Sequence, residues 1–241
     1  MSHPERIVPD ETAPGILALH LKRYEFAAAW CEGRDVLDAG CGVGYGTAYL
    51  AETARRAVGV DLSEEAIAYA RERYGAENVE FEAMDLAALN LPDASFDVVC
   101  SFETIEHVPD RERVLAEFAR VLRDDGTLLV STPQAARTTE RPENPFHHVE
   151  YARADFEALL RRRFDGVQLY GQRRLQTARH RFLQRADVLG LRKRLAFLRP
   201  ASALLGTAPM AEVTAEGIVI ERAGIERASE LVAVCTSPRR A

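Results

Sequence analysis

The sequence has no apolar run long enough to cross a membrane, no internal repeat and no low-complexity tract. Its four cysteines, Cys31, Cys41, Cys100 and Cys235, show neither CxxC spacing nor clustering with other metal ligands, so we expect free thiols rather than disulfides. The first residues carry no apolar signal-peptide region, so we expect a cytoplasmic location. A net charge of -6 argues against a nucleic-acid partner.

What the chain does have is the size and composition of one globular domain carrying an elaboration. It contains 241 residues, of which 47% are hydrophobic and 28% are charged. Short apolar runs alternate with helical patterns up to residue 133, which predicts an α/β fold with a doubly wound, mostly parallel sheet. The expected helices cover 16–33, 44–54, 63–75 and 110–123, and the expected strands cover 35–39, 56–61, 78–85, 96–102 and 126–133.

The regular alternation ends after residue 133. A further helix is expected at 153–164, a strand at 165–172 and the final strand at 229–238. Residues 172–228 are too many for a simple connection, so we expect a helical insertion there. The predicted organisation is an N-terminal segment with a covering helix (1–33), an α/β core (34–171), the insertion (172–228), and the last strand with a tail (229–241).

The insertion contains a strongly basic stretch, residues 173–199, with nine Arg and Lys and the single acid Asp187. One interpretation is the solvated face of a packed helix. Another is a lid that recognises an acidic acceptor or contacts an anionic membrane surface. A dimer interface stays open as well, and the sequence does not indicate the oligomeric state.

Four glycines, Gly40, Gly42, Gly44 and Gly46, follow the first strand, and Asp38 precedes them. Glycine costs backbone entropy, so such a cluster indicates that something needs bare backbone, and a nucleotide-like ligand is the usual reason. The dinucleotide pattern G-x-G-x-x-G fails at its last position from either of the first two glycines. Close packing of helix on strand is an equally open explanation for Gly44 and Gly46.

Two acids end the second and third strands. Asp61 lies 21 residues after Gly40, where a carboxylate can accept both ribose hydroxyls, although a nicotinamide-binding fold would place an acid there too. Asp85, between Met84 and Leu86, could hold an adenine amine and the faces of its ring. The alternatives are a helix cap for Asp61 and an ordinary loop acid for Asp85.

Several stretches resemble, in the expected order over residues 15–135, the motifs of class I S-adenosylmethionine-dependent methyltransferases: "VLDAGCGVGYG", "VGVDLSEEAIAYA", "MDLAALNLPDASFDVVCSFETIEHV" and "VLRDDGTLLVSTP". The resemblance implies a Rossmann-like, seven-stranded sheet with an antiparallel last strand, and S-adenosyl-L-methionine as cofactor. It implies that the cofactor's methionine part faces Asp38, Gly40, Cys41 and Gly42, that Asp61 and Leu62 hold the ribose, that Asp85 and Leu86 hold the adenine, and that Phe102 and Glu103 line the far side.

The segment "HLKRYEFA", residues 20–27, resembles the helix that covers the cofactor in methyltransferases of bacterial glycan and natural-product pathways. This makes Tyr24 a candidate cofactor contact and His20 a candidate for the acceptor side, with Arg23 between them. A surface arginine and a core tyrosine are the plainer interpretation.

The segment "NPFHHVEYA", residues 144–152, resembles the NPFH-x-x-EY signature of sugar and glycan methyltransferases. The resemblance implies O-methylation, with His147 or His148 as the general base and Glu150 as its partner, because an alcohol must lose a proton during attack. His107 and Tyr151 are further acceptor-side candidates. The alternatives are a purely structural loop, or a metal site from the histidines and Glu150; adjacent histidines rarely point the same way, so we expect no metal.

The segment after the fourth strand lacks the Asn/Asp-Pro-Pro-aromatic motif of enzymes that methylate ring or amide nitrogens. The sequence therefore predicts an O-methyltransferase acting on a small molecule, sugar or glycan, with no nucleic-acid partner. An N-methyltransferase for an amino sugar or other small amine is the nearest alternative. From other classes, an NAD(P)-dependent oxidoreductase and a non-catalytic cofactor-binding protein stay open.

Overall fold

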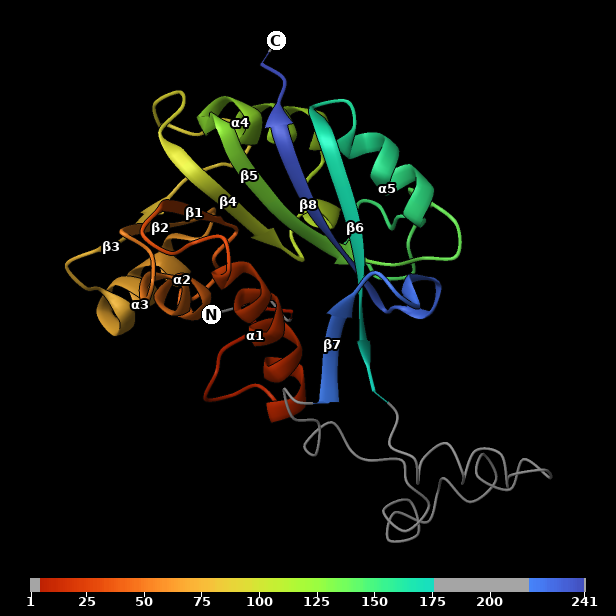
Figure 1. The fold of residues 1–241 in the computed structure, drawn as a ribbon. Helices are drawn as coiled ribbons and strands as arrows, with labels where there is room; N and C mark the ends of the chain where they lie inside the picture. Colours follow the sequence, from red (N-terminus) through yellow and green to blue (C-terminus); the bar gives the residue numbers. More distant parts are fainter. Residues whose placement is uncertain (1–4, 176–216, 241) are drawn as a thin grey trace, which may run out of the picture.

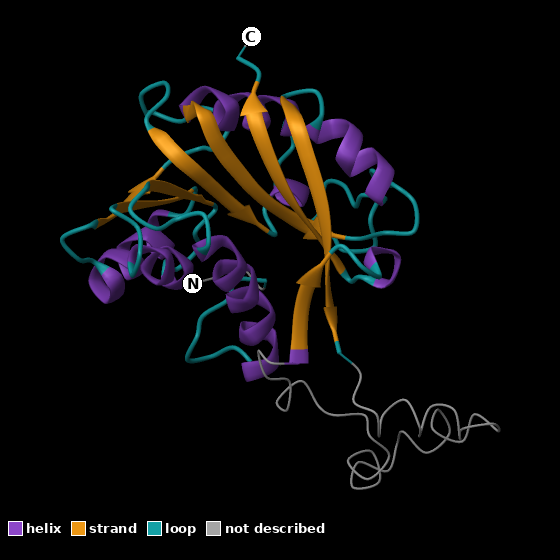
Figure 2. Cartoon of the chain, viewed as in Figure 1, coloured by secondary structure: helices purple, strands orange, loops and turns teal. Residues whose placement is uncertain are grey.

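A mixed sheet of eight strands organises the residues that the structure describes (Figures 1 and 2). The structure is a computed structural model and describes residues 5–175 and 217–240. The strand order is β3-β2-β1-β4-β5-β8-β6-β7. The strands are β1 (Asp35–Ala39), β2 (Arg56–Asp61), β3 (Val79–Ala83), β4 (Phe96–Phe102), β5 (Leu122–Pro133), β6 (Phe164–Arg174), β7 (Ile218–Glu221) and β8 (Glu230–Pro238).

The first five strands in this order are parallel, and β8 runs antiparallel to both β5 and β6. This confirms the predicted doubly wound fold and its antiparallel last strand. The helices are α1 (Pro14–Ala28), α2 (Tyr45–Ala51), α3 (Glu64–Tyr74), α4 (Arg111–Val121) and α5 (Arg153–Leu160), with short 3₁₀ helices η1 (Ile105–His107) and η4 (Ile225–Arg227).

Both faces of the central strands are covered, which explains why they read as continuous apolar runs. Val36 of β1 belongs to a cluster with α1 and α2, whereas its neighbour Leu37 belongs to the larger core with α4 and α5. All five residues of β1 are buried. The strand order and this layering bring the loops after β1, β2, β3 and β4 to one edge of the sheet, where ligands of such folds bind.

Two glycines at the start of α2, Gly44 before it and Gly46 within it, allow the helix to pack closely. A Cβ built on Gly46 would lie 1.9 Å from the Tyr24 ring, and one built on Gly44 would lie 2.7 Å from the Phe81 ring. No side chain fits at such distances, so α2 packs against α1 and β3 through bare backbone. The packing explanation of Gly44 and Gly46 is therefore confirmed.

The end of the chain departs from the prediction. In the part of the chain that the structure describes, the sheet has eight strands rather than seven, because β7 adds an edge strand antiparallel to β6. β6 continues to Arg174, and β7 and η4 both lie within 172–228, so these parts of the predicted helical insertion are extended or 3₁₀-helical instead. The basic stretch from Gln176 to Arg199, on which the lid, membrane and interface interpretations depend, lies outside the described residues.

Two other expectations, the free cysteines and the Ser63 cap, are met. All four cysteines are free and buried. Ser63 accepts a hydrogen bond from the Ala66 N–H and so caps α3, as its position before two glutamates predicts. Within residues 5–175 and 217–240, no helix is both long and apolar enough to span a bilayer.

Candidate active site

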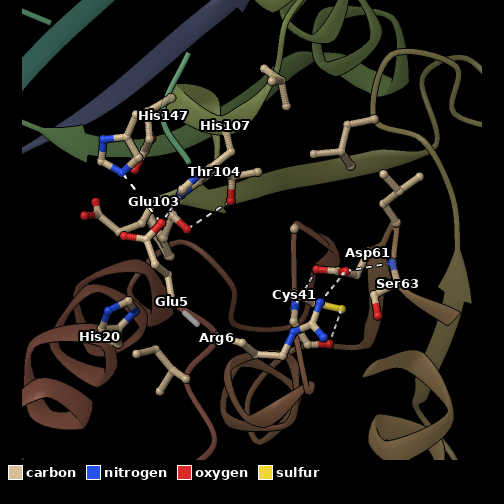
Figure 3. A pocket seen from close by; sticks show the side chains of 18 of the residues that line it. Glu5, Arg6, His20, Cys41, Asp61, Ser63, Glu103, Thr104, His107 and His147 are labelled. Atoms are coloured by element: carbon tan, nitrogen blue, oxygen red, sulfur yellow. Dashed lines mark hydrogen bonds and ion pairs between the residues drawn. The ribbon is translucent and has the colours of Figure 1, made fainter. Parts of the chain in front are cut away.

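A cavity of about 1120 Å³ opens at the carboxyl edge of the sheet. Its wall has two parts, which we call the β1–β3 side (Gly40, Gly42, Asp61, Leu62, Asp85) and the β4–β5 side (Glu103, Glu106, His107, His147). The N-terminal segment and α1 close it with residues that include Glu5, Arg6, His20 and Tyr24. Figure 3 shows Asp61 and Cys41 at one end of the cavity and His107 and His147 at the other.

Asp61 is the best-anchored acid of the β1–β3 side. Its Oδ2 accepts the backbone N–H of Gly42 at 2.9 Å, and its Oδ1 accepts that of Ser63 at 2.9 Å. Arg6 approaches Oδ1 to 3.7 Å. Because backbone donors hold the carboxylate in place, its remaining lone pairs face the cavity in one orientation, as recognition of a ribose diol requires.

The surroundings of Asp61 have room for a nucleoside. Gly42 has φ +55°, and a Cβ built on it would meet nothing within 4 Å, so the loop leaves open space toward the cavity. Leu62 is 75% exposed beside this space, so its side chain is available to pack against a bound ligand. Asp85 is exposed, and its Oδ1 accepts the Ala87 N–H at 2.8 Å. These residues fit the adenosine part of S-adenosylmethionine.

Asp38 departs from the prediction, because it does not line the cavity. It is 1% exposed, the Tyr24 hydroxyl lies 3.3 Å from both of its oxygens, and the Thr47 hydroxyl donates to it at 2.7 Å. Burial raises the pKa of Asp38 to about 7, against the lowering effect of these hydrogen bonds. Asp38 therefore ties α1 and α2 to β1 behind the glycine loop.

The surroundings of Arg23 indicate whether the site also fits the amino-acid end of S-adenosylmethionine. Its side chain is 1% exposed; Nη1 donates to Gln172 at 3.1 Å and lies 3.9 Å from Glu103. Nε and Nη2 have no hydrogen-bond partner among the described residues. Arg23 itself does not line the cavity, but it lies directly behind the wall residue Glu103 and next to Tyr24 in the chain. Unsatisfied donors on a buried cation are costly, so its charge at this position favours a ligand with a carboxylate, such as the amino-acid end of the cofactor.

The β4–β5 side centres on His147. Its Nδ1 lies 3.2 Å from Glu150 Oε1, and its Nε2 lies 3.0 Å from the Asn144 amide nitrogen. The same amide donates to Glu5 at 2.7 Å, while its oxygen accepts the Phe146 N–H at 3.0 Å, which sets the orientation of the amide. Because a carboxylate can only accept, Nδ1 of His147 carries the proton and Nε2 is the acceptor.

The other two histidines of the cavity wall have distinct environments. The Nδ1 of His107 lies 2.9 Å from the Phe146 carbonyl, and its ring meets that of His147 edge to face at 4.8 Å. Burial, and then the charge of Arg23, lowers the pKa of His20 well below its usual range, so this imidazole is neutral at neutral pH.

Three residues predicted for the acceptor side do not line the cavity. The His148 side chain is exposed, and only its backbone N–H is engaged, donating to the Glu106 carbonyl at 2.7 Å. Glu150 lies behind His147, and Tyr151 is a core residue whose ring packs 5.7 Å from that of Phe156. His147 and Glu150 meet, but the exposed His148 side chain does not join them, so the two histidines and Glu150 do not converge as a metal site.

Three residues of the cavity wall carry no prediction of their own: Glu5 and Arg6 come from a segment without any motif, and Glu106 precedes a predicted histidine. Asn144 is expected from the sequence to fix the path of its loop together with Pro145, but its hydrogen bonds to Glu5 and His147 are not predicted. Glu106 is 1% exposed and accepts from the Thr132 hydroxyl at 3.1 Å; burial and then the charge of Glu103 raise its pKa well above the usual range. A buried carboxyl group with a raised pKa at the cavity wall is a signal that only the fold reveals.

Comparison with known proteins agrees with this geometry. Residues 37–130 match the family described as "Methyltransferase domain". A Mycolicibacterium smegmatis protein named "Probable S-adenosylmethionine-dependent methyltransferase" is 40% identical over 176 residues, 66% of this chain and 68% of that protein. A relative of the same description from Mycobacterium tuberculosis is 43% identical over 160 residues, 65% of this chain and 58% of its own length.

Among solved structures, 1,6-didemethyltoxoflavin-N1-methyltransferase of Burkholderia thailandensis, bound to its substrate and S-adenosylhomocysteine, superposes with a TM-score of 0.58. Its identity is 20%, over 93% of this chain and 79% of that chain, so it supports the fold. Together with the M. smegmatis relative, these matches show that the chain is a member of the S-adenosylmethionine-dependent methyltransferase family.

Proposed function

We propose that this methyltransferase O-methylates a hydroxyl group of a small molecule, sugar or glycan, with His147 as the general base. The observation that carries the proposal is the Glu150–His147 pair, which directs Nε2 of His147 to the cavity wall. Glu150 holds the ring orientation and stabilises the imidazolium that forms when Nε2 takes a proton, as the acid of a catalytic triad does.

The two sides of the cavity would divide the work. S-Adenosylmethionine, when bound, supplies a methyl group on a positively charged sulfur. Asp61 and the open backbone at Gly42 would hold its nucleoside, with Arg23 near its carboxylate. The chain's main task is then to bring an oxygen nucleophile in line with the methyl group, a positioning effect worth several kcal/mol.

Asn144 indicates where the acceptor would bind. In this structure its amide donates to Nε2 of His147, so the lone pair that would take the proton is already held as a hydrogen-bond acceptor. An acceptor hydroxyl would replace the amide as the donor to Nε2. His20 and His107, which both line the cavity, would contact the rest of the acceptor.

Amine methylation is the second candidate, and the carboxyl groups of Glu5 and Glu103 on the cavity wall favour it, because they would attract a cationic acceptor. Relatives of both kinds exist. A fatty-acid O-methyltransferase of M. smegmatis is 38% identical over 140 residues, and phosphoethanolamine N-methyltransferase 1 of Arabidopsis thaliana is 37% identical over 145 residues. The chain spans 48% and 27% of their lengths, so neither acceptor transfers to it directly.

The test is methyl transfer from labelled S-adenosylmethionine to a panel of hydroxyl and amine acceptors. With a hydroxyl acceptor, His147→Ala should lower turnover by about 10²–10⁴ while leaving cofactor affinity unchanged. The matched control is His148→Ala, whose side chain lies outside the cavity and which should stay near the native rate. Native turnover in His147→Ala would rule out this base, and transfer to amines alone would establish N-methylation.

A further inference from the structure

Three possible metal ligands from distant parts of the chain meet on the wall of the cavity. We propose that Glu5, His107 and His147 bind a divalent transition-metal ion of the zinc class, and that this ion blocks methyl transfer by taking Nε2 of His147. The binding site stands on geometry alone, whereas the block rests on the proposed role of His147 as base.

The spacing of the three groups suits one ion. One ligand atom from each residue lies within 4.8 Å of the other two. Glu5 Oε2 is 3.9 Å from Nε2 of His107 and 4.0 Å from Nε2 of His147. Tetrahedral zinc with nitrogen and oxygen ligands separates its ligand atoms by about 3.4 Å, so each must move inward by roughly half an ångström.

Both imidazoles are held in the form that ligates metals. The Phe146 carbonyl can only accept, so Nδ1 of His107 carries the proton, and Glu150 has the same effect on Nδ1 of His147. In each ring Nε2 is then the basic nitrogen, and in each it is the nitrogen measured against Glu5. An oxygen acceptor behind the opposite N–H is the usual second interaction of a metal-bound histidine.

The ligand types indicate which ion would bind. Two imidazoles with one carboxylate favour zinc and its neighbours over magnesium or calcium, which prefer oxygen ligands. Three protein ligands leave a fourth position, and the three side chains are partly exposed, at 27%, 9% and 35% for His107, His147 and Glu5. The site is therefore reached from the cavity and can exchange its ion with solution.

Asn144 limits the affinity of the site. Its amide donates to both Glu5 Oε1 and His147 Nε2, so a bound ion replaces one donor and the amide must turn away. Ion binding and proton uptake compete for the same lone pair of His147. Zinc therefore suppresses proton removal from an acceptor, and the ion-free protein is the active form. This departs from our sequence-based expectation that the protein holds no metal.

Zinc binding is measured first, without any acceptor. The full chain is freed of metal with a chelator, which is then removed, and is titrated with zinc chloride in a calorimeter. We expect one ion per chain, with affinity at least tenfold lower in Glu5→Gln and in His107→Gln. His148→Gln is the matched control, since it removes an adjacent exposed histidine, and should bind zinc like the native protein. Cobalt(II) should give the visible absorption of a tetrahedral site in the native protein and lose it in Glu5→Gln.

The outcomes separate the site from the function. No zinc binding, or native affinity in both Glu5→Gln and His107→Gln, overturns the site. Methyl transfer in chelator that falls at least tenfold at saturating zinc supports the block; unchanged transfer at saturation overturns it. Transfer that requires zinc overturns both the block and the role of His147 as base. Zinc binding by these residues without transfer to any acceptor leaves the site standing and refutes the proposed function.

Discussion

The two sides of the cavity hold their functional groups by different means. On the β1–β3 side the carboxylates are fixed by backbone N–H groups: Asp61 by Gly42 and Ser63, and Asp85 by Ala87. On the β4–β5 side the contacts that hold His147 run between side chains, from Glu150 and Asn144, and the Asn144–Glu5 bond joins positions 139 residues apart. The first side depends on the path of short loops, and the second on which side chains the fold brings together.

This difference has a consequence for how the site can vary. Backbone donors change only if the loop changes, so the β1–β3 side should tolerate little alteration without loss of cofactor affinity. Side-chain contacts on partly exposed residues can be replaced at small cost to the fold. Under the proposed division of the cavity, rigid loops recognise the cofactor, whereas a replaceable network of side chains recognises the acceptor.

The largest effect should come from Asp38, which supports the β1–β3 side from beneath. Its pKa is about 7 in the folded chain, so the folded state holds a proton that the unfolded state releases near pH 4. This contribution to stability is complete below about pH 4 and is lost as the pH rises to about 7, on the order of 4 kcal/mol. Tyr24 and Thr47 oppose the shift by hydrogen bonding, and the charge of Asp61 adds to it.

The pH-dependent contribution of Asp38 can be measured by urea unfolding of the native protein and of Asp38→Asn, each at pH 5 and pH 8. The native free energy of unfolding should fall more steeply with pH than that of the variant. The raised pKa values of Glu106 and Glu230 act in the same direction in both proteins, so the difference isolates Asp38. Parallel pH dependences would show that Asp38 is ionised in the folded state.

The next effect concerns Asp61 and cofactor affinity. Asp61→Asn removes the charge from the predicted ribose contacts, worth about 1.5–3 kcal/mol, so calorimetry should show S-adenosylmethionine binding weakened at least tenfold. Asp85→Asn is the comparison, and because Asp85 is exposed its loss should be smaller. Equal losses in the two variants would contradict the idea that backbone anchoring makes Asp61 the principal contact.

The parts that sequence could predict are the local ones. The alternation of strands and helices, the capping role of Ser63 and the position of Asp61 at the end of β2 each depend on residues near one another in the chain. The burial of Asp38 could not be predicted from the sequence. An acid before a glycine loop has the same local sequence whether its side chain faces a ligand or a tyrosine from another helix.

The contacts on the β4–β5 side could not be predicted from the sequence. His147 could be singled out from its loop, but its proximity to Glu5 and His107 depends on three segments meeting in space. The outward position of His148 likewise follows from the loop path, with its N–H tied to Glu106. Similarly, β7 was missed because four residues without strong periodicity become a strand only when β6 offers an edge.

The need for a glycine at position 46 of α2, which packs below the β1–β3 side, can be tested by substitution. Gly46→Ala would place a methyl group 1.9 Å from the Tyr24 ring, so α1 and α2 must separate at a cost of about 1–3 kcal/mol. Gly217→Ala is the control, since its Cβ would meet nothing within 4 Å. In chemical unfolding, Gly46→Ala should have a lower free energy of unfolding than the native protein, and Gly217→Ala should stay near the native value. Equal stability of both would show that α1 adapts to α2 without cost.

The smallest effect is expected from Glu5 on stability, and it sharpens the contrast between the two sides. Glu5 is partly exposed and accepts a hydrogen bond from the Asn144 amide at 2.7 Å, a contact whose net contribution is on the order of 1 kcal/mol because water can replace it. The N-terminal segment is held instead by Val8, which is buried against Val43 and Ala66. Glu5→Gln should therefore change the free energy of unfolding by less than about 1 kcal/mol, and a double-mutant cycle with Asn144→Ala should give a coupling no larger than this.

By contrast, Val8→Ala should lower stability by more than either change, because it removes buried apolar surface. A cost above about 2 kcal/mol for Glu5→Gln would mean that the network holds the segment in place, and that the acceptor side is as much a part of the fold as the glycine loop.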